Sequence, residues 1–463
     1  MRRQRQAAVS ARPSRSAKAL TLRPMLRVWL GLGLTAAMLP AHASCVSEAT
    51  PAARHAPDPA ASRVAAQRLV SEALARSSAV GAARMTADAA LHDTDEARAA
   101  LAMQLSASAG LGPAAMRSDG VSSASLAQAR AGLSLNQLIS DGGRTERVID
   151  WRERLAEAAR LGWISSQEQV TLNTISLALE RSRYLQQQQV YAQYVAQMGC
   201  LVGSLEQIVS ADRGRLSELV QARKSMSQAE LSQEQAASQG RQASVKLRRM
   251  AGDALPDADA MLDLLLPVPE LGPLQAELAR STEIAQLDAQ AEAARQLARS
   301  VEASLKPQFS WSLAANANTG TGANTGFSRG SSLSGGLSVS IPLISPGAGA
   351  AADAARKRAQ AAQLSRDEVL EQRLSRLADL HEQARAAMDR ARRVADVLGD
   401  SDRVRDFTLQ QWQQLGRRSL FDVMAAEAEH YSLRIAEVNA RHDGQQMNAL
   451  LLSLGRGLRP WLQ

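Results

Sequence analysis

The side chains that most often carry chemistry are sparse in this 463-residue sequence and are not grouped for it. Metal sites need histidine, cysteine or carboxylate ligands at short, regular spacings. The chain also lacks a GxSxG nucleophile motif, a P-loop and a dinucleotide fingerprint. We therefore predict no catalytic residue, no metal and no cofactor. The six histidines are scattered, at His42, His55, His92, His381, His430 and His442.

Charged residues do gather around one glycine in each half of the chain. These stretches are "DRGRLSELVQAR" (Asp212–Arg223) and "QLGRRSLFDVMAAE" (Gln414–Glu427). Glycine reverses a helix where other residues are strained, so both stretches are predicted to be the tips of helical hairpins. Ordinary solvated charges at a hairpin tip are one interpretation, and a functional site at the tips is the other.

Two very long helices would position these tips. No proline occurs from Arg144 to Val209, and a second run extends from about Ala350 to Gln414. At about 1.5 Å per residue, a helix of about 66 residues measures about 100 Å. Ordinary globular helices have about 10 to 14 residues. Both runs therefore predict long struts of a helical hairpin assembly.

Apolar residues near the end of the first run form two seams with coiled-coil spacing. A single seam would fit a simple dimer, whereas two seams predict a helix with neighbours on both sides, as in a ring. The first seam is Tyr191, Val195, Met198, Val202, Leu205 and Val209, and the second is Tyr194, Met198, Leu201, Leu205 and Ile208.

Four stretches alternate apolar and polar residues and are predicted to be strands. Each has about ten residues, the length that crosses a bilayer at a tilt with one face toward lipid. Soluble hairpins with one buried face are the alternative. The stretches are Leu101–Leu111, Ala127–Gln137, Pro307–Ala317 and Leu333–Ile341.

The whole chain after its N-terminus is a tandem repeat. "GLSLNQLISDGG" (Gly132–Gly143) and "GLSVSIPLISPG" (Gly336–Gly347) each end a strand pair and open a long helix. We expect a mixed, mainly α fold of long antiparallel hairpins with four strands, because both halves repeat the same element order. The predicted divisions are a first repeat at 59–251, a linker at 252–273, a second repeat at 274–457 and a tail at 458–463.

Shorter helices would complete the struts. Ser217–Ala251 and about Leu274–Ser304 together match the length of one long helix. The helices near Ala60–Ala97 and Leu420–Gly455 are expected to stack in the same way. Each half would then supply one continuous and one broken strut.

The first 43 residues are predicted to be a secretory signal, and 44–58 a flexible mature N-terminus. Basic residues precede an apolar run, Met25–Leu39, and a small-residue site at Ala41–Ala43. A membrane anchor is the alternative, although the run is short for a span. Cys45 lies beside the cleavage site, which makes N-terminal lipidation an open question.

The leader also explains the charge of +8. Eight of the 54 basic residues lie in 1–43, which contain no acid, so the rest of the chain carries 46 basic and 46 acidic residues. A mature chain near neutrality gives no indication of nucleic-acid binding.

Four membrane strands cannot close a barrel by themselves. An open sheet edge in lipid leaves backbone groups unpaired, at a cost of several kcal/mol each. Eight strands are the usual minimum, so the chain is expected to share its barrel with copies of itself, and three copies would give twelve strands.

This order of elements, repeated twice, resembles the TolC-like outer-membrane channel family, the outer membrane factors of drug efflux and type I secretion. The resemblance covers about residues 58–457. "LNQLISDGGR" and "VSIPLISPG" match the family's strand-end pattern, in which "PLFDGG" is usual. Ile139 and Ile344 replace the aromatic residue of that pattern, and "SPGAG" replaces the second "DGG".

The resemblance implies a homotrimer in the outer membrane of a Gram-negative bacterium, with a twelve-stranded barrel in lipid and a twelve-helix tunnel through the periplasm. It implies a passive exit duct, not an enzyme, in a tripartite efflux or type I secretion system. An inner-membrane pump, either an ABC transporter or a proton-driven one, and its periplasmic adaptor would open the duct by docking.

The resemblance also assigns roles at the tips. The family pairs a basic residue of the second tip with an acid of the first, which corresponds to Arg418 and Glu218, although the first tip is two residues shorter than usual. Asp422 matches an acid that lines the mouth, where three copies would form a ring favouring cations. Ala425 stands where a second acid is common. The adaptor-docking residues would be Gly214, Arg215, Leu216 and Ser217 on the first tip and Gly416, Arg417, Arg418 and Ser419 on the second.

Two other functions fit part of the pattern. A periplasmic adaptor also has long hairpins, but it would have one hairpin flanked by β domains. A structural periplasmic coiled coil would have no strands of this kind. The doubled strand pairs favour the duct over both.

Overall fold

The computed structural model describes residues 59–118, 121–256, 261, 264, 267–322, 326–415 and 418–462. The predicted signal at 1–43, the N-terminal segment at 44–58 and Cys45 lie outside these residues. Two of the expected tip residues, Gly416 and Arg417, also lie outside them.

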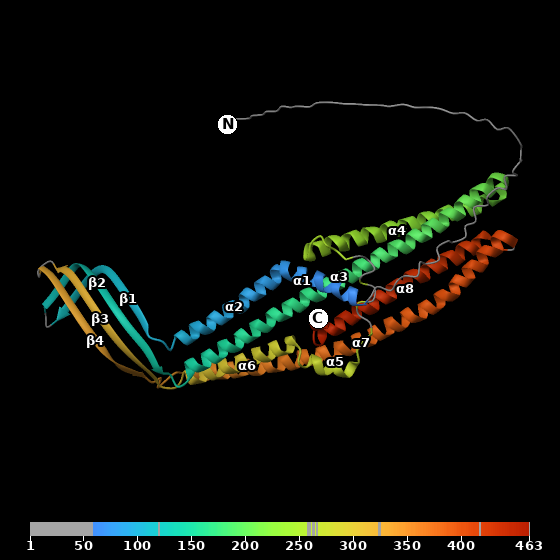
Figure 1. The fold of residues 1–463 in the computed structure, drawn as a ribbon. Helices are drawn as coiled ribbons and strands as arrows, with labels where there is room; N and C mark the ends of the chain where they lie inside the picture. Colours follow the sequence, from blue (N-terminus) through green and yellow to red (C-terminus); the bar gives the residue numbers. More distant parts are fainter. Residues whose placement is uncertain are drawn as a thin grey trace, which may run out of the picture. The chain divides into compact units, whose positions relative to one another are not determined.

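Two antiparallel helical hairpins make up most of the molecule (Figure 1). The first joins α3 (Arg144–Ala211) to α4 (Leu216–Ala251) through the short 3-10 turn η1 (Arg213–Arg215). The second joins α7 (Ala348–Leu415) to α8 (Leu420–Leu454). α3 and α7 each have 68 residues, which confirms the two long struts.

Shorter helices accompany the long ones. α1 (Pro59–Arg76) and α2 (Ser78–Ala99) are separated at Ser77, whose side chain accepts a hydrogen bond from Val80 N and caps α2. α5 (Leu271–Leu278) and α6 (Thr282–Ala303) follow the linker, and α9 (Arg459–Leu462) ends the described chain.

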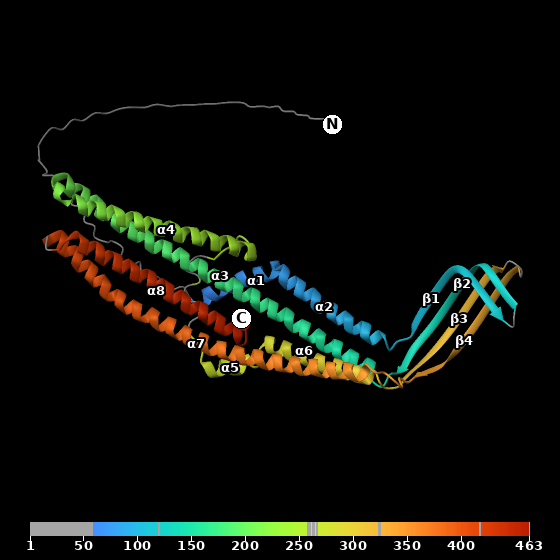
Figure 2. The same cartoon turned by 180° about the vertical axis from the view of Figure 1, so that it is seen from behind.

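The broken struts are combined differently from the expectation. α2 and α4 both pack along α3, on one side of it, whereas α6 and α8 both pack between α3 and α7 (Figures 1 and 2). The predicted stacks of α4 with α6 and of the N-terminal helix with α8 are therefore wrong. α6 lies on the other side of α3 from α4 (Figures 1 and 2).

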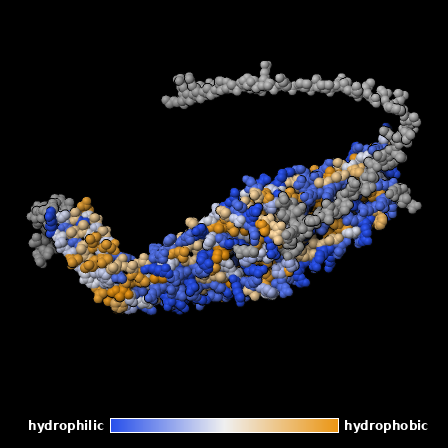
Figure 3. Space-filling model, viewed as in Figure 1, coloured by the Kyte–Doolittle hydropathy of each residue, from blue (hydrophilic) through white to orange (hydrophobic). Residues whose placement is uncertain are grey.

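The four strands form one antiparallel sheet in the order β1-β2-β3-β4. The strands are β1 (Gln104–Ser118), β2 (Val121–Ser140), β3 (Gln308–Gly322) and β4 (Gly326–Ser340). Their register aligns Leu105 with Leu135 and Leu313, and Ala107 with Leu133, Ala315 and Leu333, all on one face. Leu105, Leu133 and Leu333 are exposed there, and Figure 3 shows apolar side chains gathered over the sheet.

Each strand pair leads into a long helix with no other helix or strand between them, β2 into α3 and β4 into α7. β2 ends at Ser140, and Gly142 and Gly143 then adopt left-handed φ angles of 68° and 86° before α3 begins. The carboxylate of Asp141 accepts hydrogen bonds from Thr145 N and Oγ1, at 2.8 and 2.5 Å, and so caps the new helix. These contacts explain the sequence "SDGG" at the junction, since glycine adopts left-handed angles without strain.

The largest apolar core lies where α1, α3, α4, α8 and α9 meet. Leu69 on α1, Ile175 and Leu179 on α3 and Leu247 on α4 are almost completely buried there. A smaller core joins α5 to α7 and α8 through Leu278, Leu377 and Leu451. Among the described helices, none combines the length and apolarity needed to cross a membrane.

Replacing Leu69 by alanine should lower the stability of this core by about 2 to 5 kcal/mol, because the substitution leaves a cavity. Val64→Ala, on the same helix but at a side chain 55% exposed, should change the stability by less than about 0.5 kcal/mol. Thermal unfolding followed by circular dichroism in detergent compares the two. Equal midpoints would contradict the placement of α1 in the core.

Candidate functional site at the hairpin tips

The first tip reverses the chain within four residues. α3 ends at Ala211, and Asp212 Oδ1 accepts a hydrogen bond from Gly214 N at 2.9 Å across the turn. A Cβ atom on Gly214 would lie only 3.1 Å from that oxygen, which is a reason for glycine here. Arg215 Nη1 approaches Glu218 Oε2 at 4.0 Å. Leu216 and Ser217 open α4 and are exposed.

The second tip ends in a capping box at the start of α8. Ser419 Oγ accepts from Asp422 N, and Asp422 Oδ2 accepts from Ser419 N, both at 3.3 Å. Arg418 donates from Nε to Gln411 Oε1 at 3.1 Å and lies 4.0 Å from Asp422. Asp422, expected to line a mouth, therefore also fixes the beginning of its own helix.

The expected latch residues contact their own hairpins within this protomer. Glu218 approaches Arg215, and Arg418 contacts Gln411 and Asp422. A pair between Glu218 and Arg418 thus stays a prediction about neighbouring protomers.

An apolar cluster fixes the two tips side by side. It joins Leu201, Leu205 and Leu219 of the first hairpin to Leu420 and Val423 of the second. Met198, Leu201 and Leu205 are completely buried. α3 contacts both α4 and α8, which agrees with the expectation that this helix has neighbours on two sides.

A buried polar cluster lies next to this apolar cluster and joins α3, α7 and α8. Glu427 is 0% exposed and accepts a hydrogen bond from Gln197 Nε2 at 3.0 Å. Its second oxygen, Oε2, has no hydrogen-bond partner among the described residues. Burial raises the pKa of Glu427 to about 7, although the nearby Arg405 opposes this shift.

The pKa of His430, one turn further along α8, is shifted in the opposite direction. It is 2% exposed, and its Nδ1 lies 3.4 Å from Asp402 Oδ1 on α7. Burial, followed by the charge of Arg405, lowers the pKa of His430 to about 4. The rings of Tyr194 and Tyr431 stack at 4.7 Å beside the pair. Sequence reasoning missed this cluster, because it counted His430 only as one scattered histidine.

The residue types in this cluster could in principle bind a metal, but their arrangement does not. Asp402 and Asp406 on α7 are both paired with the guanidinium of Arg405, at 3.6 and 3.1 Å. In the described part of the chain, no group of three His, Cys, Asp or Glu side chains is placed to hold a metal ion. The cluster is therefore a charge network between helices.

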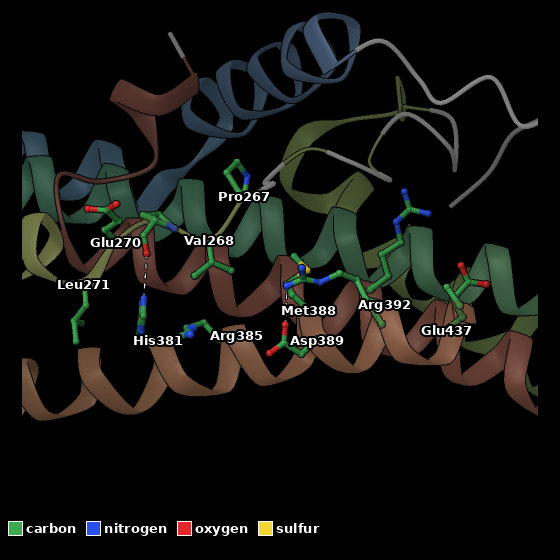
Figure 4. Close-up of a pocket in the computed structure, with 14 residues that line it drawn as sticks. Pro267, Val268, Glu270, Leu271, His381, Arg385, Met388, Asp389, Arg392 and Glu437 are labelled. Carbon is green, nitrogen blue, oxygen red and sulfur yellow. Dashed lines mark hydrogen bonds and ion pairs between the residues drawn. The ribbon is translucent and has the colours of Figure 1, made fainter. Parts of the chain in front are cut away.

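A separate open cavity of about 780 Å³ lies between the linker and helices α7 and α8 (Figure 4). Val268, Leu271 and Met388 give it an apolar side, and Arg385 and Arg392 give it a charged one. His381 Nε2 lies 3.1 Å from Pro269 O and connects the linker to α7. Its side chains show no arrangement of nucleophile and base.

The sequence matches the model of a family described as "Outer membrane efflux protein" over residues 69–253 and 274–456. No curated protein matches the chain closely enough to count as a relative.

Solved structures of outer-membrane channels share the fold. VceC of Vibrio cholerae is 18% identical with a TM-score of 0.72, covering 85% of this chain and 97% of that one. OprN is 18% identical with a TM-score of 0.74, covering 88% and 91%. The open state of MtrE from Neisseria gonorrhoeae is 16% identical with a TM-score of 0.71, covering 85% and 89%.

The buried cluster predicts opposing effects of pH on stability. The raised pKa of Glu427 contributes stability that is complete below about pH 4.5 and is lost as the pH rises through about 7. The lowered pKa of His430 contributes stability that is complete above about pH 6.5 and is lost as the pH falls through about 4. Between pH 4.5 and 6.5 the two contributions change the stability in opposite directions as the pH rises.

In the Glu427→Gln variant, the pH dependence of stability that comes from His430 should no longer be opposed by Glu427. Relative to the wild type, its stability should increase from pH 4.5 to 7 by about 3 kcal/mol per protomer, because glutamine does not titrate. His430→Gln should show the opposite trend between pH 4 and 6.5. Unfolding midpoints measured across this range test both, and parallel curves for all three proteins would show that neither group titrates in this range.

Proposed function

Because this chain belongs to the outer membrane efflux protein family, we propose that it is a passive exit duct through the outer membrane of a Gram-negative bacterium. The observation that carries the proposal is an open sheet with one apolar face, whose strands run directly into long helices. In this proposal the sheet lies in lipid and the helices extend through the periplasm. Phe309 and Trp311 would mark the inner boundary of the apolar face.

The sheet by itself cannot remain in a membrane. β1 and β4 are its two edges, and the unpaired backbone groups of each edge strand would cost several kcal/mol apiece in lipid. Pairing β4 of one copy with β1 of the next removes every edge. Three copies of the four-stranded sheet give a twelve-stranded barrel.

The helices have their free edges on the same sides as the sheet. β1 follows α2, and β4 leads into α7. The helices nearer the sheet contact one another in the order α2-α3-α6-α7. The helices nearer the tips do so in the order α4-α3-α8-α7. One rotation would therefore close both the barrel and a ring of helices. Exposed apolar residues on both helical edges support this closure: Val220, Leu231 and Val245 on α4, and Leu364, Val397 and Phe407 on α7.

The tips are proposed to be the periplasmic mouth, where a periplasmic adaptor and an inner-membrane pump dock. Leu216 and Phe421 are large apolar side chains that remain 54% and 47% exposed there. Exposed apolar groups at a polar tip are suited to burial against a partner. The pump would be either an ABC transporter of a type I secretion system or a proton-driven drug pump.

The mouth is proposed to be closed in the isolated duct. Arg418 of one protomer would pair with Glu218 of the next, and three copies of Asp422 would form a cation-favouring ring. Arg418 and Asp422 are about half exposed, which leaves both side chains accessible to a neighbour.

Conductance of the purified protein in a planar bilayer tests the proposal. The wild type should give small, cation-preferring steps, and Arg418→Ser should enlarge them because the latch is lost. Arg403→Ser is the matched control: Arg403 is an exposed α7 arginine that pairs with Asp400, away from the tip. It should leave the steps unchanged.

Equal steps in all three proteins would support the duct and refute the latch. Failure of a folded, helical wild type to conduct would refute the duct and favour a structural coiled coil or an adaptor. Cross-linking of the detergent-solubilised protein should produce a ladder that ends at three chains.

A further inference from the structure

The face of the sheet opposite the apolar one contains a single arginine whose position is set by the register. Arg130 on β2 pairs with Gly110 on β1 and Asn318 on β3, which in turn pairs with Gly330 on β4. Ser106 and Ser134 lie on this same face and are hydrogen-bonded through their hydroxyl groups at 2.6 Å. In the proposed barrel this polar face lines the lumen, because the leucine-bearing face must meet lipid.

No carboxylate in the sheet neutralises this arginine. The four strands contain three arginines, Arg117, Arg130 and Arg329, and no aspartate or glutamate. Arg130 donates from Nε to Gln128 Oε1 at 2.8 Å. This bond directs the guanidinium toward Gln128 on its own strand.

Glycines leave open space around the guanidinium. Gly110 and Gly330 occupy the outer positions of its row, so neither edge of the row adds a side chain. The amide of Asn318 lies over Gly330, where a Cβ atom would be only 2.6 Å from its Oδ1. Asn316 lies over Gly132 in the same way, at 2.7 Å. The amides thus lie flat against the sheet, and the arginine is the longest side chain in its row.

We propose that Arg130 forms a ring of three guanidinium groups within the lumen that binds anionic groups of the exported molecule. The proposal rests on the trimeric duct described above. A guanidinium suits carboxylate or phosphate groups, since it offers parallel N–H donors and a permanent charge. The ring would favour export of molecules with such groups.

Arg329 provides a matched control on the other face. It pairs with Thr319, one register position from Asn318, and shares the apolar face with Leu111 and Ala129. It has the same charge at nearly the same height in the sheet, but it points away from the lumen. The Arg329→Gln variant therefore tests whether a positive charge on either face of the sheet is sufficient for anion binding.

Single-channel recording with inorganic tripolyphosphate on the barrel side tests the ring. The wild type should show transient block whose frequency falls as the salt concentration rises, since salt screens exposed charges. Arg130→Gln should weaken the block by about tenfold or more, because the symmetric assembly loses three guanidinium groups together. Arg130→Lys should retain much of the block, and Arg329→Gln should retain all of it.

Unchanged block in Arg130→Gln, or equal weakening in Arg329→Gln, would overturn the inference while conductance itself continued to support the duct. A wild type that never conducts would refute the duct, and with it the lumen on which the ring depends. A wild type that conducts without any block by tripolyphosphate would refute the ring alone.

Discussion

The structure depends on the requirement that every backbone N–H and C=O group have a partner where water is absent. Helices meet this requirement within one segment, but a sheet meets it only when each strand has two neighbours. The four-stranded sheet leaves β1 and β4 with one neighbour each. The free edges of the helical layer lie on α2, α4 and α7, the helices on the same sides. In the proposed duct, a single closed ring of copies would satisfy both layers, and the apolar face of the sheet would place that ring in lipid.

Within the protomer, α3 is the strut on which the other elements are assembled. It packs on α2 and α4 with one side and on α6 and α8 with the other. The buried side chains of α3 are mostly small or branched apolar ones. Two apolar clusters lie along the helix, one around Leu179 and one around Leu205. The core around Leu205 lies close to the end of α3 and includes Leu219 and Leu420, so it positions the two tips directly.

Near the tip, the packing includes charged groups that are expensive to bury. Glu427 and His430 lie in the same interface, and burial shifts the pKa of each toward its neutral form. Arg405, held by Asp402 and Asp406, is the permanent charge between them. Such an interface is stable only while its polar partners stay in place. The joint between the hairpins is therefore more sensitive to rearrangement than an apolar joint of the same area would be.

The elements and their order could be predicted from local sequence signals. Alternation over four stretches predicted the strands, the proline-free runs predicted α3 and α7, and the repeat of "GLSLNQLISDGG" as "GLSVSIPLISPG" located both strand-to-helix junctions. These signals are local, because periodicity and turn residues act through neighbours along the chain. The tip residues were located in the same way, through glycine and its charged neighbours.

Which elements lie side by side became evident from the packing of the folded chain. Against the expectation, α2 and α4 lie together along α3, and α6 and α8 lie together between α3 and α7. The packing also brought Gln197 and Glu427 together across 230 residues. No local pattern specifies such a contact, since it arises from the burial of surfaces on helices that are distant in sequence. The register that places Arg130 and Arg329 on opposite faces is likewise a property of strand pairing, and it fixes which side chains face the interior of a closed ring.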